Sequence, residues 1–216
     1  MNWHWLSANA GRIGGLALDH LLLTLPAVVL AFFIAVPLGW LAHSSGRARE
    51  VLVVATSLIY VIPSLALFIL LPLVLRTSVL SPLNVIAAMT LYGIALMVRA
   101  SADAFGSVPA AVRQSATAAG YAPRARVLRV ELPLAGPGLL AGLRVVTAST
   151  VSLVSVGALI GVQSLGTLFT EGFQRSFPTQ IIAGLVGTIV LAVLLDATLV
   201  AIGRIAMPWT RKAAHR

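Results

Sequence analysis

Residues 107–133 read SVPAAVRQSATAAGYAPRARVLRVELP, and they separate two strongly apolar parts of the chain. The stretch carries four arginines and one glutamate, whereas the residues on either side are rich in leucine, valine and alanine. Charged side chains are costly inside a bilayer. The stretch therefore predicts a charged hairpin outside the membrane, between two membrane spans.

The local chemistry of this hairpin predicts two short helices with a break between them. Pro109 lies in a first helical turn, where its missing N–H costs no hydrogen bond. We expect the first helix over Ala110 to Ala119, ended by Gly120 in a left-handed conformation. The second helix begins at Pro123 and is expected to end at Pro133, because proline lacks the N–H that would continue it.

The composition of the whole chain is that of an integral membrane protein. Hydrophobic residues make up 59% of its 216 residues and charged residues only 10%, and its mean hydropathy is +0.99. Soluble domains contain roughly 45 to 50% apolar residues. We expect an all-α, polytopic transmembrane bundle that forms one domain over residues 1–216. The chain contains no cysteine, which excludes a disulfide framework, thiol catalysis and a cysteine metal site.

Five apolar runs are candidates for membrane spans, and the hairpin lies between the third and the fourth. They cover Leu21 to Ala42, Val51 to Leu75, Leu83 to Val98, Leu139 to Val162 and Ile181 to Met207. A span needs about 20 residues, so the third run is short. Pro26, Pro37, Pro63 and Pro72 lie in the first two runs, where we expect kinked helices.

Basic residues gather on one side of these five runs. The residues on that side are Arg47, Arg49, Arg99, Arg113, Arg124, Arg126, Arg129, Arg211, Lys212 and Arg216. Only Arg12, Arg76 and Arg175 fall on the other side. Cytoplasmic loops carry the excess of Lys and Arg, so we expect the N-terminus outside and the hairpin and C-terminus in the cytoplasm. This topology accounts for the net charge of +9 without a nucleic-acid partner.

Two ionisable residues fall within the apolar runs at similar depth. At about 1.5 Å per residue, Arg144 lies roughly 9 Å from the start of the fourth run and Asp196 roughly 15 Å from the inner end of the fifth. They can therefore pair between the two helices. Such a pair is either a structural contact or part of a transport path.

Small and hydroxyl residues recur along the fourth run. Ser149, Ser152 and Ser155 repeat at helical spacing, and Gly157 and Gly161 form a small-xxx-small pair. This pattern is typical of close helix packing in membranes. A face that lines a pathway or a subunit interface is the alternative interpretation.

Other chemistries find little support in the sequence. Four scattered histidines and the absence of an H-E-x-x-H motif predict no catalytic and no metal site. There is no G-x-x-x-x-G-K-[ST] loop, and Lys212 is the only lysine, so the chain is not expected to hydrolyse ATP by itself. A DNA-binding helix-turn-helix is disfavoured because both ends of the hairpin enter the membrane within a few residues. An intramembrane enzyme or a passive channel stays open as an alternative of another class.

Seven hairpin residues follow a gap-free spacing, and they are Gln114, Ser115, Ala116, Gly120, Val130, Leu132 and Pro133. This spacing resembles the cytoplasmic loop of importer-type ABC transporter permeases. The pattern of that loop is Glu-Ala-Ala, three residues, Gly, nine residues, Ile-x-Leu-Pro. In this chain Gln114 replaces the family's Glu, Ser115 replaces its first Ala, and Val130 replaces Ile.

The resemblance implies that the first hairpin helix is a coupling helix, which docks on an ATPase and moves with it as a rigid body. The implied coupling residues are Ala110, Arg113, Gln114, Ser115, Ala116, Ala119, Gly120, Leu132 and Pro133. The resemblance also implies that no cofactor binds the chain directly and that ATP and Mg²⁺ bind the partner ATPase subunits. The further partners implied are a second permease subunit and an extracytoplasmic binding protein. The arginines of the hairpin either support docking or only set the topology.

Three other segments resemble the osmoprotectant permeases for glycine betaine, carnitine and choline. They are Val36 to Gly39, Ile62 to Ala66 and Ala158 to Gly166. The resemblance implies import of a compatible solute, and import of another small polar solute such as an amino acid is the alternative. Aromatic rings attract quaternary ammonium groups. The candidate path residues are Tyr60, Ser64, Tyr92, Ser149, Ser152 and Ser155, although packing is the alternative role of both tyrosines.

Overall fold

The computed structural model describes residues 1–209, apart from the side chains of residues 47 and 48. Its elements are α1 (Trp3–Ala8), α2 (Ala10–Ser44), α3 (Gly46–Val61), α4 (Ser64–Leu75), α5 (Pro82–Gly106), α6 (Ala110–Ala118), α7 (Pro123–Arg126), the π-helix η1 (Val127–Glu131), α8 (Leu132–Val154), the 3₁₀-helix η2 (Ser155–Ile160), α9 (Gly166–Gln174) and α10 (Pro178–Ala206). No strand occurs among these residues, and the predicted all-α fold is confirmed.

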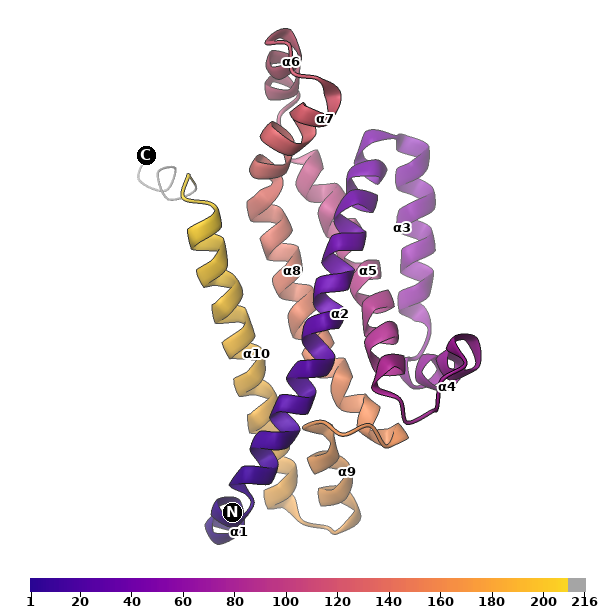
Figure 1. The fold of residues 1–216 in the computed structure, drawn as a ribbon, viewed down its shortest axis with the longest axis vertical. Coiled ribbons are helices and arrows are strands. Elements are labelled where there is room, and N and C mark those ends of the chain that lie inside the picture. Colours follow the sequence, from indigo (N-terminus) through magenta and orange to yellow (C-terminus); the bar gives the residue numbers. More distant parts are fainter. Residues whose placement is uncertain (210–216) are drawn as a thin grey trace.

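The long helices form an elongated bundle with the hairpin at one end (Figure 1). Helices α6 and α7 project beyond the other elements, and α2 and α10 end on the same side of the molecule. The N-terminus, α1 and α9 lie at the opposite end. The hairpin and the N-terminus therefore lie at opposite ends of the bundle. The basic residues at positions 211, 212 and 216, which contribute to the predicted membrane orientation, lie outside the described residues.

Four helices of the described chain are long and apolar enough to cross a membrane, namely Ala10–Ser44, Pro82–Gly106, Pro123–Ile160 and Pro178–Ala206. A fifth span results if α3 and α4 are counted together, although they meet at an angle of 102°. The predicted number of about five spans is therefore confirmed.

The expected single span over Val51 to Leu75 is wrong in detail, because Pro63 breaks it into α3 and α4. Proline has no N–H to continue the helix, and it disfavours a helical conformation in the residue before it. The break leaves the carbonyl of Ile62 without a helical partner, and the hydroxyl of Tyr92 donates a hydrogen bond to it. Pro26 and Pro37, in contrast, remain inside the continuous helix α2.

Most helices extend beyond the apolar runs. Helix α2 begins at Ala10 rather than Leu21, and α5 ends at Gly106 rather than Val98. Helix α10, Pro178–Ala206, comes close to the fifth predicted run. An apolar run marks only the part of a helix that suits hydrocarbon, whereas backbone hydrogen bonds continue as long as the local sequence permits.

The predicted helix end at Pro133 is also wrong, because the chain is helical without interruption from Pro123 to Ile160. The turn just before the proline is a π-helix, in which the N–H of Leu132 donates to the carbonyl of Val127. Such a wide turn contains one extra residue and rearranges the carbonyls that precede the proline ring. Pro133 itself lies in the first turn of α8.

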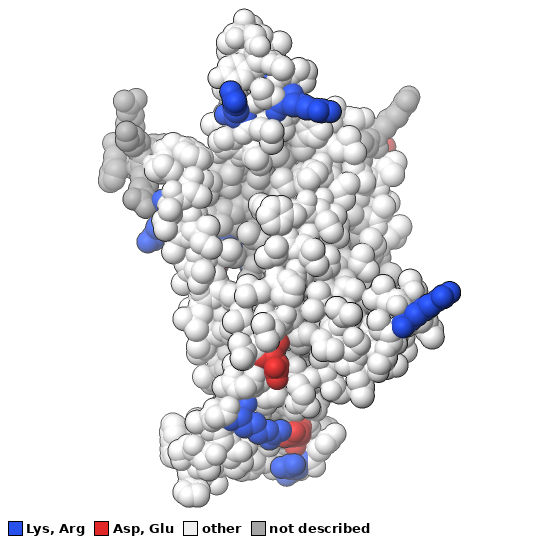
Figure 2. Space-filling model, viewed as in Figure 1, with Lys and Arg blue, Asp and Glu red and all other residues white. Residues whose placement is uncertain are grey.

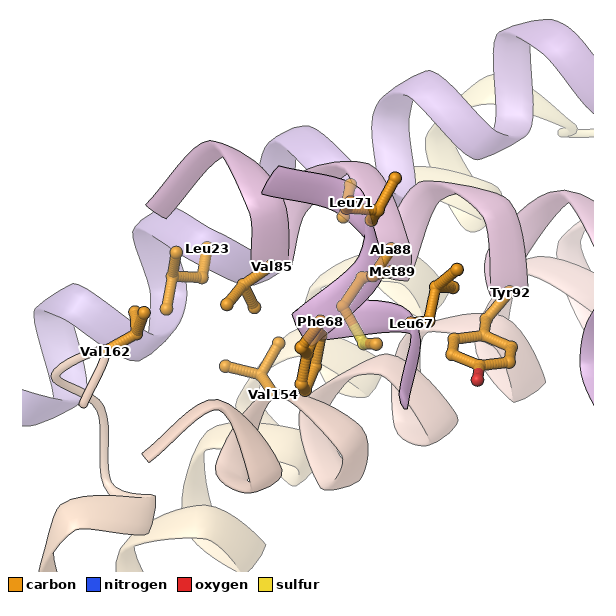
Figure 3. Close-up of a cluster of buried hydrophobic side chains, with 11 residues drawn as sticks. Leu23, Leu67, Phe68, Leu71, Val85, Ala88, Met89, Tyr92, Val154 and Val162 are labelled. Atoms are coloured by element: carbon orange, nitrogen blue, oxygen red, sulfur yellow. The ribbon is translucent and has the colours of Figure 1, made fainter. Parts of the chain in front are cut away.

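Three clusters of buried side chains hold the bundle together. The first joins α2, α4, α5 and α8 around the fully buried Phe68 and Met89 (Figure 3). The second lies nearer the hairpin and contains Phe105. The third joins α2, α9 and α10 at the opposite end. Small residues allow close helix contact: a Cβ atom added at Gly93 of α5 would lie 2.6 Å from the Cβ of Ala31 in α2.

Candidate functional site

Helix α6 ends in a Schellman motif at Gly120, the residue that the sequence predicted to be left-handed. Its φ of +83° is left-handed. The N–H of Gly120 donates to the carbonyl of Thr117 at 3.0 Å, and the N–H of Tyr121 donates to that of Ala116 at 3.1 Å. These two bonds satisfy carbonyls at the end of the helix. The last helical residue is Ala118, and Ala119 is the C-cap.

Helix α6 is held to the rest of the molecule by little apolar packing. Ala116 is its only buried residue, and Arg113 is half-buried. The exposed predicted coupling residues are Ala110, Gln114, Ser115, Ala119 and Gly120. Leu132 and Pro133 lie apart from these residues, half-buried at the start of α8. The projecting helix thus presents a surface that nothing in the described chain covers.

Polar side chains join α6 to the base of α8. Nε of Arg126 donates to Oε1 of Glu131 at 2.8 Å, and Nη1 of Arg126 donates to the hydroxyl of Thr117 at 3.0 Å. The side chain of Glu131 is only 3% exposed, so Arg126 supplies the charged partner that a buried carboxylate requires. Arg126 and Glu131 are five residues apart, which is the spacing that a π-turn brings together.

A second polar link joins α6 to the end of α2. Nη1 of Arg113 lies 2.8 Å from Nε2 of His43. An arginine has no acceptor atom, so Nε2 accepts this hydrogen bond and the imidazole carries its proton on Nδ1. Gly106 lies beside the same ring. Nearby, Arg49 of α3 pairs with Asp103 of α5 at 2.7 Å.

An open groove of about 520 Å³ runs between the two hairpin helices. It is lined by Ala110, Arg113, Gln114, Thr117, Ala118 and Arg126. The lining includes two guanidinium groups and no carboxylate, so the groove favours a polar or acidic group over a basic one. Basic side chains lie just below the hairpin tip in Figure 2, whereas the middle of the same face is nearly free of charge.

The candidate path residues fall into two groups. Tyr60 and Tyr92 meet edge to face with ring centroids 5.6 Å apart, and Ser64 begins α4 beside them at the Pro63 break. Tyr60 is 44% exposed, whereas Tyr92 is buried and bonded to the Ile62 carbonyl. Tyr92 is thus packed in the core with its hydroxyl hydrogen-bonded, whereas part of the Tyr60 side chain is exposed.

The three serines lie along α8 and η2. Ser152 is exposed and Ser149 is half-buried, whereas the hydroxyl of Ser155 is buried and has no hydrogen-bond partner among the described residues. Val154, adjacent to Ser155, packs in the same cluster as Tyr92. The two groups of path candidates therefore lie on elements that share one apolar core.

The suggested contact between Arg144 and Asp196 is confirmed. Nε and Nη2 of Arg144 donate to the two carboxylate oxygens of Asp196 at 2.5 and 2.8 Å. Both side chains are more than 40% exposed on the isolated chain. An exposed ion pair so far from the helix ends requires water or another subunit beside it.

Polar groups also fasten the end of the bundle opposite the hairpin. Nη2 of Arg12 donates to Oε1 of Glu171 at 2.5 Å, and Gln180 donates to the other carboxylate oxygen at 2.7 Å. The hydrogen bond from Arg12 lowers the pKa of Glu171, and the bond from Gln180 acts in the same direction against partial burial. Trp5 packs edge to face on Phe177 at the same end.

Sequence reasoning missed the polar links of the hairpin. Arg126 and Glu131 were noted only as charges, Thr117 was not noted, and His43 appeared to be an isolated histidine. One signal was available: Glu131 is the only carboxylate of the hairpin and lies beside four arginines. Within residues 1–209, no group of three or more histidine or acidic side chains could hold a metal ion.

Comparisons with known proteins give a consistent result. A family model described as "binding-protein-dependent transport system inner membrane component" matches residues 27–212. The osmoprotectant import permease protein OsmW of Salmonella typhimurium is 32% identical over 195 residues, which cover 89% of this chain and 91% of that protein. The glycine betaine/carnitine/choline transport system permease protein OpuCD of Bacillus subtilis is 30% identical and covers 98% of this chain and 91% of its own length.

A solved structure has the same fold. The MetNI methionine ABC transporter, crystallised in an inward-facing conformation, contains a chain that superposes with a TM-score of 0.80. The match covers 95% of this chain and 99% of that chain at 20% identity. At this level of identity the likeness shows the fold alone.

Proposed function

Because the chain belongs to the family of binding-protein-dependent transport system inner membrane components, we propose that it forms the transport path of an ATP-driven importer for osmoprotectants. The cargo proposed is a quaternary amine such as glycine betaine, choline or carnitine. The observation that carries this proposal is the identity of about 30%, over almost the full chain, to permeases named for these solutes.

Within the hairpin of residues 107–133, the proposed site of ATPase docking is the face of helix α6 that carries Gln114 and Ser115. Helix α6 projects from the bundle and exposes Gln114 and Ser115 beside the groove. ATP and Mg²⁺ are bound by the partner subunits. Because hairpin loops rich in arginine lie in the cytoplasm, the N-terminus and α9 are assigned to the outer side, where an extracytoplasmic binding protein delivers the solute.

A second permease subunit is proposed to complete the path. Helix α10 has an apolar segment of which no residue is buried within this chain. The ion pair of Arg144 and Asp196 joins this helix to α8 and is exposed in the same way. A face that combines apolar residues with a charged pair is suited to a subunit interface or to a path containing water, and less to lipid.

The cation of the solute is proposed to pass over the exposed ring of Tyr60. Aromatic faces attract quaternary ammonium groups by about 0.5 to 2 kcal/mol, which suits a low-affinity path. Tyr92 holds Tyr60 in an edge-to-face contact, and Ser64 is the nearest hydroxyl in the chain after the break. Ser149 and Ser152 are proposed to line the path on α8, with Ser155 at its end.

Reconstitution tests the proposal. The chain is placed in proteoliposomes with the ATPase and the binding protein encoded beside it, and uptake of labelled glycine betaine, choline and methionine is measured. We expect ATP-dependent uptake of the quaternary amines and weak uptake of methionine. Failure of any ATPase to associate contradicts the importer function, and uptake of methionine alone contradicts the cargo.

Tyr60 provides a sharper test of the path. Tyr60→Phe keeps the aromatic face and should retain uptake, whereas Tyr60→Leu should lower it. Tyr121 of the hairpin is similarly exposed, at 41% against 44%, so Tyr121→Leu is the matched control for loss of a tyrosine. Equal uptake by Tyr60→Leu and the wild-type chain would exclude this ring from the path.

A further inference from the structure

Helix α6 depends on side-chain links for its orientation. Only Ala116 of this helix is buried, and the helix is flanked by Pro109 and by the left-handed Gly120. Neither flanking residue extends the α6 helix into its neighbours. A movement of α6 is therefore transmitted to the membrane spans only through the few side chains that connect them.

Arg126 makes the contact that joins α6 to α8. Its guanidinium donates through Nε to Glu131 and through Nη1 to Thr117, at 2.8 and 3.0 Å. A planar guanidinium that uses two of its edges at once has a fixed orientation. Glu131 is buried at the start of α8, so one side of the link is anchored in the body. Thr117 anchors the other side in the last turn of α6.

The helix beyond this link is continuous. Residues 123–160 form one helix, and its far end carries Ser149 and Ser152, the proposed path residues. A displacement delivered at Arg126 is thus applied to the base of the helix that lines the path. Because the hydrogen bonds and the buried carboxylate hold Arg126 on both sides, its movement follows that of α6.

From this geometry we infer that Arg126 is a positioning residue, which transmits the movement of α6 to α8 through Thr117 and Glu131. This inference rests on the proposed function. It assigns the coupling between ATP hydrolysis and transport to a link within the permease, in addition to the surface that docks on the ATPase.

Neighbouring arginines do not share this role. Arg124 and Arg129 are exposed, and neither side chain makes an ion pair or hydrogen bond with the part of the chain that the structure describes. They lie two and three residues from Arg126 and carry the same charge. Arg124→Gln and Arg129→Gln are therefore matched controls for the loss of one positive charge from this segment.

The test measures solute molecules transported per ATP hydrolysed by the reconstituted importer. We expect Arg126→Gln and Thr117→Val to lower this ratio by about tenfold, a factor that corresponds to about 1.4 kcal/mol. ATPase binding should persist in both, because the docking surface remains. Arg126→Lys should give an intermediate number of solute molecules per ATP. Lysine keeps the positive charge beside Glu131 but lacks the planar guanidinium that bonds Glu131 and Thr117 together. The two control variants should stay within about twofold of the wild-type ratio.

Folding defects are separated from loss of the link by a double variant. Arg126→Gln alone leaves the carboxylate of Glu131 buried without its partner, which can lower expression. Arg126→Gln with Glu131→Gln removes the buried charge and should restore expression but not the ratio. A wild-type ratio in this double variant, or an equal fall in Arg124→Gln, overturns the inference. Absence of ATP-dependent uptake by the unaltered chain instead contradicts the proposed function.

Discussion

Replacement of Gly120 by valine tests the hairpin most directly. Gly120 has a φ of +83°, and its N–H and that of Tyr121 close the end of α6. A β-branched residue is poorly compatible with this left-handed conformation. We expect Gly120→Val to open the last turn of α6 and thereby to displace Thr117, which lies in that turn. The membrane spans should not be disturbed.

The size of the effect follows from the surroundings of Gly120. A Cβ atom at this position would meet nothing within 4 Å, so the cost is conformational and not steric. The left-handed conformation costs an ordinary L-residue roughly 1 to 2 kcal/mol. That amount changes the ratio of the closed to the open turn by a factor of roughly 5 to 30. The buried clusters lie elsewhere, so the protein should still insert and fold.

The assay combines uptake with a local probe of α6. Because the chain has no cysteine, a single cysteine in place of the exposed Ser115 can carry a spin label whose mobility reports on the helix. Gly120→Val should increase the mobility of the label and lower uptake per ATP hydrolysed. Gly120→Asn is the conservative variant, because asparagine tolerates left-handed backbone better than other residues. Gly14→Val is the control at an open position without positive φ.

Unchanged uptake and label mobility in Gly120→Val would refute the reasoning, since the turn would then not govern α6. A loss of uptake in Gly14→Val as large as that in Gly120→Val would also refute it. The effect would in that case reflect valine in place of an open glycine and not the left-handed turn.

Three further variants test other parts of the molecule. Asp196→Asn should reduce assembly or uptake by leaving Arg144 without its anion, and wild-type behaviour in both assays would exclude a role for the pair. Arg12 lowers the pKa of Glu171, so the stabilisation that this contact gives is present above the unfolded carboxyl's pKa of about 4.3. It should be lost as the pH falls through the lower folded pKa, and thermal melts of Glu171→Gln should lack this acid dependence. Phe68→Ala should destabilise the fold by about 3 to 5 kcal/mol, because the ring is completely buried, and a melting temperature near wild type would contradict this.

Local chemistry was the best guide from sequence to structure. Pro109 and Gly120 delimit α6 to within one residue of the prediction, because backbone restrictions of proline and glycine act whatever the tertiary fold. The pairing of Arg144 with Asp196 was also predictable, since two charges at matching depth have few other partners in a membrane.

Contacts that depend on an irregular backbone could not be predicted. The bond from Tyr92 to the Ile62 carbonyl exists because Pro63 bends the chain by 102° at that point. The pair of Arg126 and Glu131 depends on the π-turn, and regular helical spacing puts residues five apart on different faces. A periodic pattern contains neither feature.

The π-turn also changes how the hairpin is connected to the fourth span. A helix ending at Pro133 would have left the charged segment as a separate unit, joined to the fourth span by a flexible connection. The 38 residues from Pro123 to Ile160 instead form one helix, which at 1.5 Å per residue is about 57 Å long. Its end at the hairpin includes Arg126, and its distant end carries the serines of the proposed path. Because the backbone is helical throughout, a displacement of the helix base can reach the other end without a chain of intermediate side-chain contacts.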